Sequence, residues 1–178
     1  TAISQRTKEE ILEYADVPET RIIVIENPLQ EQYLSPTETV FRADEPTILQ
    51  VGTLPNKNLP NVARALSGIP CRLRIVGSLT EEQKDILADC RVNYTNDPEL
   101  DDEGMRRAYE DADIVMFCST FEGFGMPLIE GQSMRRAVVT SRIRPLTDVG
   151  GDGAFYADPT NVEEIRAAVL DAIGKDSL

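Results

Sequence analysis

Residues 113–130 read DIVMFCSTFEGFGMPLIE, and the rest of the chain repeats the pattern of this stretch. It opens with a short run of β-branched and apolar residues, which is typical of a buried strand. A loop with two glycines follows, and Pro127 then stands where a helix would have its first turn, a position that favours proline. The stretch therefore predicts a strand, a loop and a helix in that order.

From residue 46 onward, short strand-like runs alternate with helical patterns, which is typical of parallel βαβ units. The predicted strands are residues 47–52, 72–77, 91–94, 113–118, 137–141 and 154–157. Two predicted helices begin with the form of a capping box, Thr80-x-x-Gln83 and Thr160-x-x-Glu163. The sequence thus predicts an α/β domain with a Rossmann-like, doubly wound parallel sheet of six strands.

Residues 1–45 are expected to lie outside this domain, which we assign to residues 46–178. A helix with its own Thr7-x-x-Glu10 box is predicted at residues 7–14, and a strand at residues 21–26. Residues 27–46 carry three prolines and no clear periodicity, which indicates a linker.

Composition limits the function classes. A length of 178 residues suits one sizeable core and leaves no room for two full catalytic lobes. The net charge of −13 argues against a nucleic-acid surface, because phosphate backbones are held by clustered Lys and Arg. Apolar runs fall far short of the roughly 20 residues of a membrane helix, and the first residues lack a secretory signal. We therefore expect no transmembrane segment and a cytoplasmic protein, with its three cysteines reduced.

A candidate site follows from the predicted topology. In a doubly wound sheet, ligands bind where the strand order reverses, at the carboxyl ends of strands one and four. The loops at residues 53–58 and 119–125 should therefore be neighbours. A helix beginning near Met126 would offer unpaired backbone N–H groups and a partial positive charge, which suits an anion such as pyrophosphate. Lys57 would add a full positive charge from the other loop.

Within residues 119–130, Gly123 and Gly125 would let the backbone approach a ligand closely, and Phe124 would wedge into the core. Glu122 and Glu130 bracket this helix start. Because two carboxylates would repel a diphosphate, we expect them to accept hydrogen bonds from sugar hydroxyls, one on a hexose and the other on a ribose.

These residues resemble the donor-binding lobe of glycosyltransferase family 4, which are retaining enzymes of the GT-B fold with two Rossmann-like lobes. The resemblance covers nearly the whole chain. It is carried by GTLPNKN at residues 52–58, YEDAD at 109–113, the Glu122-x7-Glu130 motif and GGDG at 150–153. Thr53 departs from the pattern, because many members carry arginine there.

The resemblance implies roles for individual residues. Glu122 would contact hexose hydroxyls, Glu130 would bind the ribose, and Lys57 would bridge the pyrophosphate; the base would lie near a loop at residues 94–96. Lys57 and Glu122 are thus the predicted catalytic residues. The predicted donor contacts are Lys57, Thr95, Gly123, Phe124, Gly125, Met126, Pro127, Leu128 and Glu130.

The resemblance also implies a UDP-, GDP- or ADP-hexose donor and no metal or other cofactor. Residues 1–26 would be the tail of an acceptor-binding lobe that is otherwise missing, so the chain alone would be inactive. The sequence does not identify the base, the hexose or the acceptor.

Three other functions are consistent with parts of the sequence. A metal-dependent GT-A transferase could use Asp111 and Asp113 as an Asp-x-Asp pair. A nicotinamide dehydrogenase is disfavoured, because residues 52–55 lack the Gly-x-Gly-x-x-Gly fingerprint. A noncatalytic nucleotide-sugar sensor or scaffold stays open.

Overall fold

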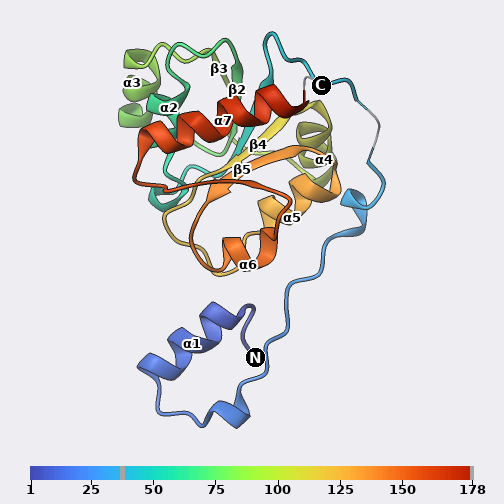
Figure 1. Cartoon of the computed structure of the whole chain (residues 1–178), viewed down its shortest axis with the longest axis vertical. Coiled ribbons are helices and arrows are strands. Elements are labelled where there is room, and N and C mark those ends of the chain that lie inside the picture. The colour runs from blue at the N-terminus through green and yellow to red at the C-terminus, as the bar shows by residue number, and fades with distance from the viewer. Residues whose placement is uncertain (37–38, 177–178) are drawn as a thin grey trace.

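The computed structural model describes residues 1–36 and 39–176, with side chains to residue 175. Six parallel strands form one sheet in the order β3-β2-β1-β4-β5-β6 (Figure 1). They are β1 (Thr47–Val51), β2 (Arg72–Val76), β3 (Tyr94–Asp97), β4 (Ile114–Phe117), β5 (Ala137–Ser141) and β6 (Phe155–Ala157). The order reverses between β1 and β4, so the predicted doubly wound fold is confirmed.

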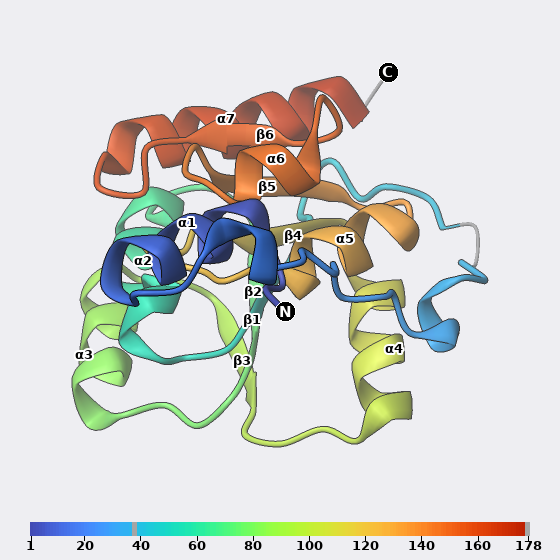
Figure 2. The ribbon, with the colours of Figure 1, turned by 90° about the horizontal axis from the view of Figure 1, so that it is seen from below.

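Helices cover both faces of the sheet (Figures 1 and 2). One face carries α2 (Leu59–Leu66), α3 (Glu81–Asp89) and α7 (Val162–Asp176). The other carries α4 (Asp102–Asp111), α5 (Met126–Ser133) and α6 (Leu146–Gly150). None of the helices in the described part of the chain is both long and apolar enough to cross a bilayer.

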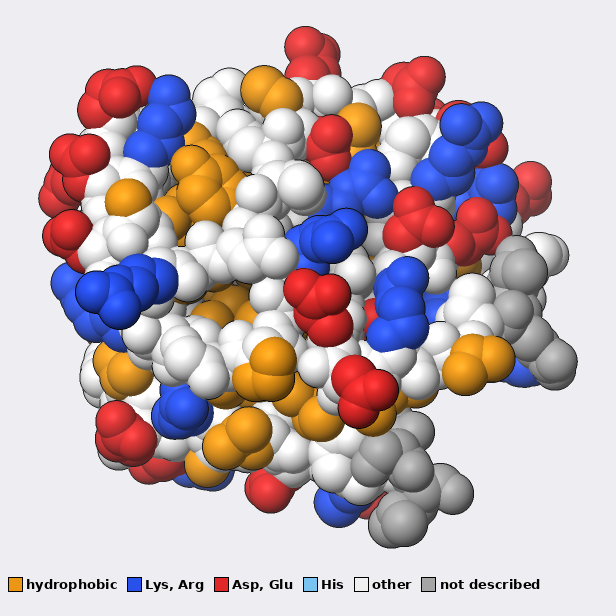
Figure 3. Space-filling model, turned by 90° about the horizontal axis from the view of Figure 1, so that it is seen from above, with side chains coloured by type: hydrophobic (Ala, Val, Ile, Leu, Met, Phe, Trp, Pro, Cys, Tyr) orange, Lys and Arg blue, Asp and Glu red, His pale blue; other side chains and the backbone are white. Residues whose placement is uncertain are grey.

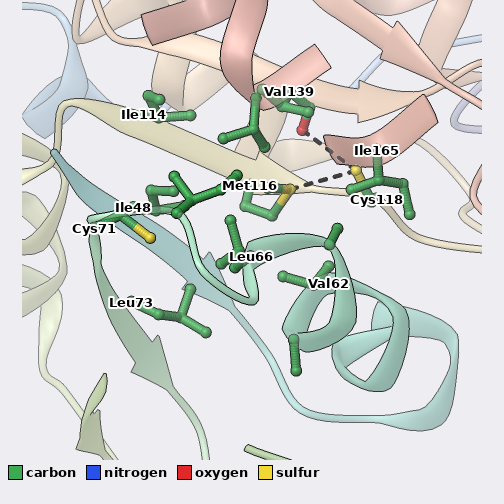
Figure 4. Packing of buried hydrophobic residues seen from close by; sticks show 14 of the residues in the cluster. Ile48, Val62, Leu66, Cys71, Leu73, Ile114, Met116, Cys118, Val139 and Ile165 are labelled. Carbon is green, nitrogen blue, oxygen red and sulfur yellow. Dashed lines mark hydrogen bonds between the residues drawn. The ribbon is translucent and has the colours of Figure 1, made fainter. Parts of the chain in front are cut away.

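The core on the α2 side is built from alternate residues of the central strands. Ile48 of β1 and Leu73 of β2 are fully buried there, and Val62 and Leu66 of α2 pack against the same cluster (Figure 4). Burial of each such side chain contributes about 1.5–3 kcal/mol, so this packing fixes α2 and the loop before it.

Five strands lie within one residue of their predicted bounds, and β3 does not. It occupies residues 94–97 instead of 91–94. Arg91 has a positive φ of 52°, and the Val92 N–H donates to Leu87 O, so residues 91–92 close the end of α3. The predicted strand at residues 91–94 is therefore wrong, because residues 91 and 92 belong to the turn that ends α3.

Two of the three capping boxes are wrong. Thr80 and Gln83 form the predicted box at α3. The first helix, α1 (Gln5–Tyr14), is instead capped by Ser4, whose Oγ accepts from the Thr7 N–H at 3.1 Å. At α7, Asn161 Oδ1 accepts from the N–H groups of the two following glutamates, Glu163 and Glu164. Asn and Ser are as good caps as Thr, so the pattern misplaced the helix starts.

The strand predicted at residues 21–26 is also absent from the described chain. A 3₁₀ turn occupies Glu19–Arg21, and one isolated parallel bridge joins Ala2 to Val24. A strand needs a neighbour along its length, and residue 2 supplies a single pairing.

The predicted linker is fastened to the domain. A 3₁₀ turn at Glu31–Tyr33 buries Tyr33, whose ring meets Tyr109 of α4 edge-on at a centroid distance of 5.3 Å. Ser133 Oγ of α5 donates to Tyr33 O at 2.6 Å. Residues 37, 38, 177 and 178, which the predicted linker and domain include, lie outside the described residues.

Charges of both signs are mixed on the surface. Figure 3 views the side opposite to that of Figure 2, and its Lys and Arg side chains are interspersed with Asp and Glu. This face therefore presents no continuous basic patch.

Asp113 joins the end of the linker to the sheet. Its carboxylate is 2% exposed and accepts from the Thr47 N–H at 2.7 Å and from Arg42 N and Nε at 3.1 and 2.9 Å. A buried carboxylate with three donors holds the beginnings of β1 and β4 together.

We expect Asp113→Ala to lower the free energy of unfolding by about 2–3 kcal/mol, because it leaves the Thr47 N–H without its acceptor. Arg42 is half exposed and would hydrogen-bond to water instead, so the loss of its ion pair contributes little to this decrease. Asp111→Ala is the matched control, since Asp111 is mostly exposed, and it should cost less than about 0.5 kcal/mol. Urea denaturation measures both, and equal losses would contradict the assignment.

Candidate functional site

Two loops meet at the carboxyl edge of the sheet because β1 pairs with β4. The Thr120 N–H donates to Asn56 O at 2.8 Å, and Asn56 Nδ2 donates to Phe121 O at 3.0 Å. The predicted meeting of the loops after strands one and four is therefore confirmed. Figure 2 views the molecule with α1 in front.

Lys57 and Glu122 form an ion pair across these loops. Lys57 Nζ lies 2.6 Å from Glu122 Oε1, and the side chains are only 17% and 13% exposed. Lys57 Nζ also lies 4.7 Å from the centroid of the Phe117 ring. The sequence predicted both residues at the site but not that they would pair.

Gly52 makes room for the lysine. Its φ is +89°, and a Cβ there would lie 3.2 Å from Lys57 Cγ and Cε. The stem of Lys57 therefore crosses the backbone at the end of β1, where a side chain would obstruct it.

Two buried polar residues that sequence reasoning missed hold the Lys57 backbone. Gln50 Nε2 donates to Lys57 O at 3.0 Å. Asn58 adopts a left-handed φ of 60°, and its Nδ2 donates to Cys118 O at 3.0 Å and to Pro159 O at 2.7 Å. A Gln inside an otherwise apolar strand, and an Asn directly after the lysine, were the available signals.

The start of α5 leaves a set of backbone donors unused. Gly125 precedes the helix with φ +110°, and the Leu128 N–H bonds back to Gly125 O at 3.0 Å. No group in residues 1–36 or 39–176 accepts a hydrogen bond from the N–H of Phe124, Gly125 or Met126. Such a helix start favours an anion, because the donors and the helix dipole act together.

Both glycines of this loop lie close to side chains of the protein. A Cβ on Gly123 would lie 3.1 Å from Ile3 Cδ1, and one on Gly125 would lie 2.5 Å from Leu146 Cδ2. Thr7 Oγ1 also donates to Gly123 O at 3.3 Å. Room for these side chains is a reason for the glycines that the sequence did not predict, and the predicted burial of Phe124 is confirmed at 6% exposure.

Glu130 lies in α5 beneath this loop and is 9% exposed. The Tyr109 hydroxyl donates to Glu130 Oε2 at 2.6 Å. Burial raises the pKa of the Glu130 carboxyl above its ordinary value, and the hydrogen bond from Tyr109 opposes that rise. No group in the described chain donates to the other oxygen, Oε1.

Three more predicted contacts follow Gly125. Met126 and Pro127 are half-buried in the first turn of α5. Leu128 is fully buried in the core, and its N–H is already bonded to Gly125 O. Leu128 therefore packs in the core, and its contact with a donor stays a prediction.

Thr95 lies apart from the two loops. Residues 94–96 form part of β3 rather than a loop after it, which corrects their predicted position. Thr95 pairs in register with Arg74 and lines a cavity of about 410 Å³. The other lining residues are Arg42, Thr47, Arg72, Arg74, Asp97 and Asp111. None of them belongs to the loops that carry Lys57 and Glu122.

The aspartates of the Asp-x-Asp alternative are used elsewhere. Asp113 is bonded to Arg42, and Asp111 Oδ2 lies 3.3 Å from Arg74 Nη1. Within the described residues, no three His, Cys, Asp or Glu side chains gather as metal ligands would. Both aspartates therefore pair with arginines, and only Asp113 is buried.

Comparisons with solved structures match the fold to the C-terminal Rossmann-like lobe of GT-B glycosyltransferases. A glycosyltransferase from Rickettsia africae superposes with a TM-score of 0.82 at 21% identity, over 97% of this chain and 52% of that one. WaaG, a glycosyltransferase involved in lipopolysaccharide biosynthesis, gives a TM-score of 0.81 at 13% identity, over 97% and 53%. S. aureus TarM, in a complex that includes UDP, gives 0.81 at 19% identity, over 99% and 37%.

Sequence comparison identifies curated relatives in Escherichia coli. The chain is 27% identical to O-antigen chain mannosyltransferase B, over 98% of this chain and 51% of that protein. It is 24% identical to serotype-specific mannosyltransferase WbdA, over 97% and 24%. The chain thus spans about half the length of the first relative and about a quarter of the second.

The family model described as glycosyl transferases group 1 matches residues 45–175. This match covers the sheet, both loops of the site and the helices on both faces. The chain therefore belongs to the group 1 glycosyl transferases.

Proposed function

We propose that this chain is the nucleotide-sugar-binding half of a retaining glycosyltransferase that transfers a hexose from a UDP-, GDP- or ADP-sugar. The observation that carries the proposal is the set of unused N–H groups at Phe124, Gly125 and Met126, in the same loop as the partner of Lys57. The retaining outcome, the absence of a metal cofactor and a cytoplasmic location come from the resemblance to family 4 and the sequence.

The diphosphate of the donor is assigned to the start of α5. Hydrogen bonds to a charged group contribute about 1.5–3 kcal/mol each, and the N–H groups there are already oriented. Lys57 has three N–H donors, so it can keep Glu122 and still bind a phosphate oxygen. During transfer the diphosphate leaves with growing negative charge, which the same donors would stabilise.

The sugars are assigned to the two glutamates. Glu122 Oε1 accepts hydrogen bonds from Lys57 Nζ and Asn56 Nδ2, and Glu130 Oε2 accepts one from the Tyr109 hydroxyl. In the described chain, the second oxygen of each glutamate has no donor. Each side chain is therefore held through one oxygen and can accept a hydrogen bond from a sugar hydroxyl on the other. This supports the proposal that Glu122 binds the hexose and Glu130 binds the ribose.

The names of the curated relatives make mannose the first hexose to test. Residues 1–45 are proposed as the tail of an acceptor-binding lobe and the connection to it. The UDP in the TarM complex supports including uridine donors beside guanosine and adenosine donors.

We expect calorimetry with UDP-, GDP- and ADP-linked mannose and glucose to detect binding of at least one donor. Lys57→Met should weaken it by about 10- to 100-fold, because one charge-assisted hydrogen bond is lost. Lys175→Met is the matched control, since Lys175 is exposed on α7 and packs on Phe155. If the folded wild-type chain binds none of these donors, the proposal is wrong.

Glu122→Gln tests the hexose contact separately. The substitution keeps the shape, removes a negative charge and frees Lys57, so binding of the bare nucleoside diphosphate should be unchanged or tighter. Binding of the nucleotide sugar should lose about tenfold relative to that diphosphate, because a neutral amide is a weaker acceptor than a carboxylate. The ratio of the two dissociation constants is the measurement, and an unchanged ratio would remove Glu122 from the hexose site.

The chain alone should transfer no sugar in a turnover assay, because the acceptor side is absent from the proposed half-enzyme. Transfer by the full-length protein that contains it, measured on the same donor, would separate a transferase from the noncatalytic sensor. Transfer by this chain alone would contradict the half-enzyme assignment.

A further inference from the structure

Tyr109 and Glu130 form a buried polar pair between α4 and α5. Tyr109 is fully buried, and its hydroxyl lies 2.6 Å from Glu130 Oε2. A hydrogen bond this short is typical of a hydroxyl donating to a charged oxygen. The pair therefore fixes the direction of the carboxylate.

We propose that Tyr109 is a positioning residue for Glu130, whose hydroxyl holds one carboxylate oxygen so that the other can accept a hydrogen bond from the donor's ribose. This inference rests on the proposed function. Glu130 has three rotatable side-chain bonds, and its free Oε1 has no donor in the described chain. Without Tyr109, ordering that side chain would be an entropic cost of ligand binding.

Tyr109 is itself held by the segment that precedes the domain. The Tyr33 ring meets it edge-on, with an interplanar angle of 77°. Tyr33 is in turn bonded through its carbonyl oxygen to Ser133, on the same helix as Glu130. The phenol therefore contacts both the segment before β1, through the Tyr33 ring, and α5, through the hydrogen bond to Glu130.

The pKa of Glu130 distinguishes a positioning role of Tyr109 from a role in packing alone. The titratable groups that face Glu130 are Tyr109 from α4 and Tyr33 from the preceding segment. Burial, and then the charge of Glu130, raise the pKa of the Tyr109 phenol, so it remains a donor at neutral pH. Removing this donor would leave burial unopposed and raise the pKa of Glu130 further.

Tyr109→Phe deletes only the hydroxyl. We expect the carboxyl carbon of Glu130, followed by NMR in the 13C-labelled chain, to titrate at a higher pH than in the wild type. The ligand is whichever of GDP, UDP and ADP the wild type binds most tightly. We expect Tyr109→Phe to weaken its binding about tenfold at pH 6 and by less at pH 8, because more Glu130 is protonated at the lower pH. Tyr33→Phe leaves the hydrogen bond between Tyr109 and Glu130 in place and is the matched control. It should change neither the titration of Glu130 nor the affinity for the diphosphate.

The ribose contact is tested with the 2′-deoxy and 3′-deoxy forms of that diphosphate. The wild type should bind at least one of them more weakly than the parent, and both Tyr109→Phe and Glu130→Gln should lose most of that discrimination. In the Glu130→Gln background, Tyr109→Phe should have little further effect, because the two residues act as one unit.

The outcomes separate the two proposals. If the wild type binds none of the three diphosphates, the proposed function and this inference both fail. If it binds one and Tyr109→Phe keeps its affinity, pH profile and deoxy discrimination, only this inference is overturned. Should Tyr109→Phe fail to fold, a 3-fluorotyrosine at position 109 keeps the shape with a more acidic donor. It should then move the Glu130 titration to lower pH, and no shift would overturn the inference.

Discussion

The pairing of β1 with β4 is the constraint on which the site depends. These strands are 62 residues or more apart in the sequence, and their parallel register brings Gln50 level with Met116. Because both strands run in the same direction, the loops that leave them emerge together. Every contact between Asn56, Lys57 and the residues after Ser119 follows from this adjacency.

The proposed diphosphate site is compatible with an acidic chain, because its donors are local. With a net charge of −13, long-range attraction works against an anion. The N–H groups at the start of α5 and the ammonium of Lys57 act over a few ångströms, where screening and remote charges matter less. Lys57 donates to Glu122 and Tyr109 donates to Glu130, so one oxygen of each nearby carboxylate already has a donor of the protein.

The sequence was sufficient for the sheet, the meeting of the two loops and the start of α5, because strand alternation and proline at a first turn are local signals. It was not sufficient for the partners of the site residues. Tyr109 and Glu130 meet only after α4 and α5 pack, and the signal at Tyr109 was lost in a helix whose other residues are mostly charged. The proximity of Gly123 to Ile3 was not predicted for the same reason, since the two residues are 120 positions apart in the sequence.

This last contact bears on the predicted boundary near residue 45. If the first 45 residues were only a remnant of another lobe, they would not need to touch the site. Yet Ile3 and Thr7 contact Gly123, and Arg144 after β5 binds Glu9 at 3.0 Å. Tyr33 packs on Tyr109 behind Glu130. The preceding segment therefore supports both ends of residues 122–130, one through Gly123 and the other through Tyr109. We therefore expect a shift of that segment relative to the sheet to change the geometry of the proposed donor site at both ends.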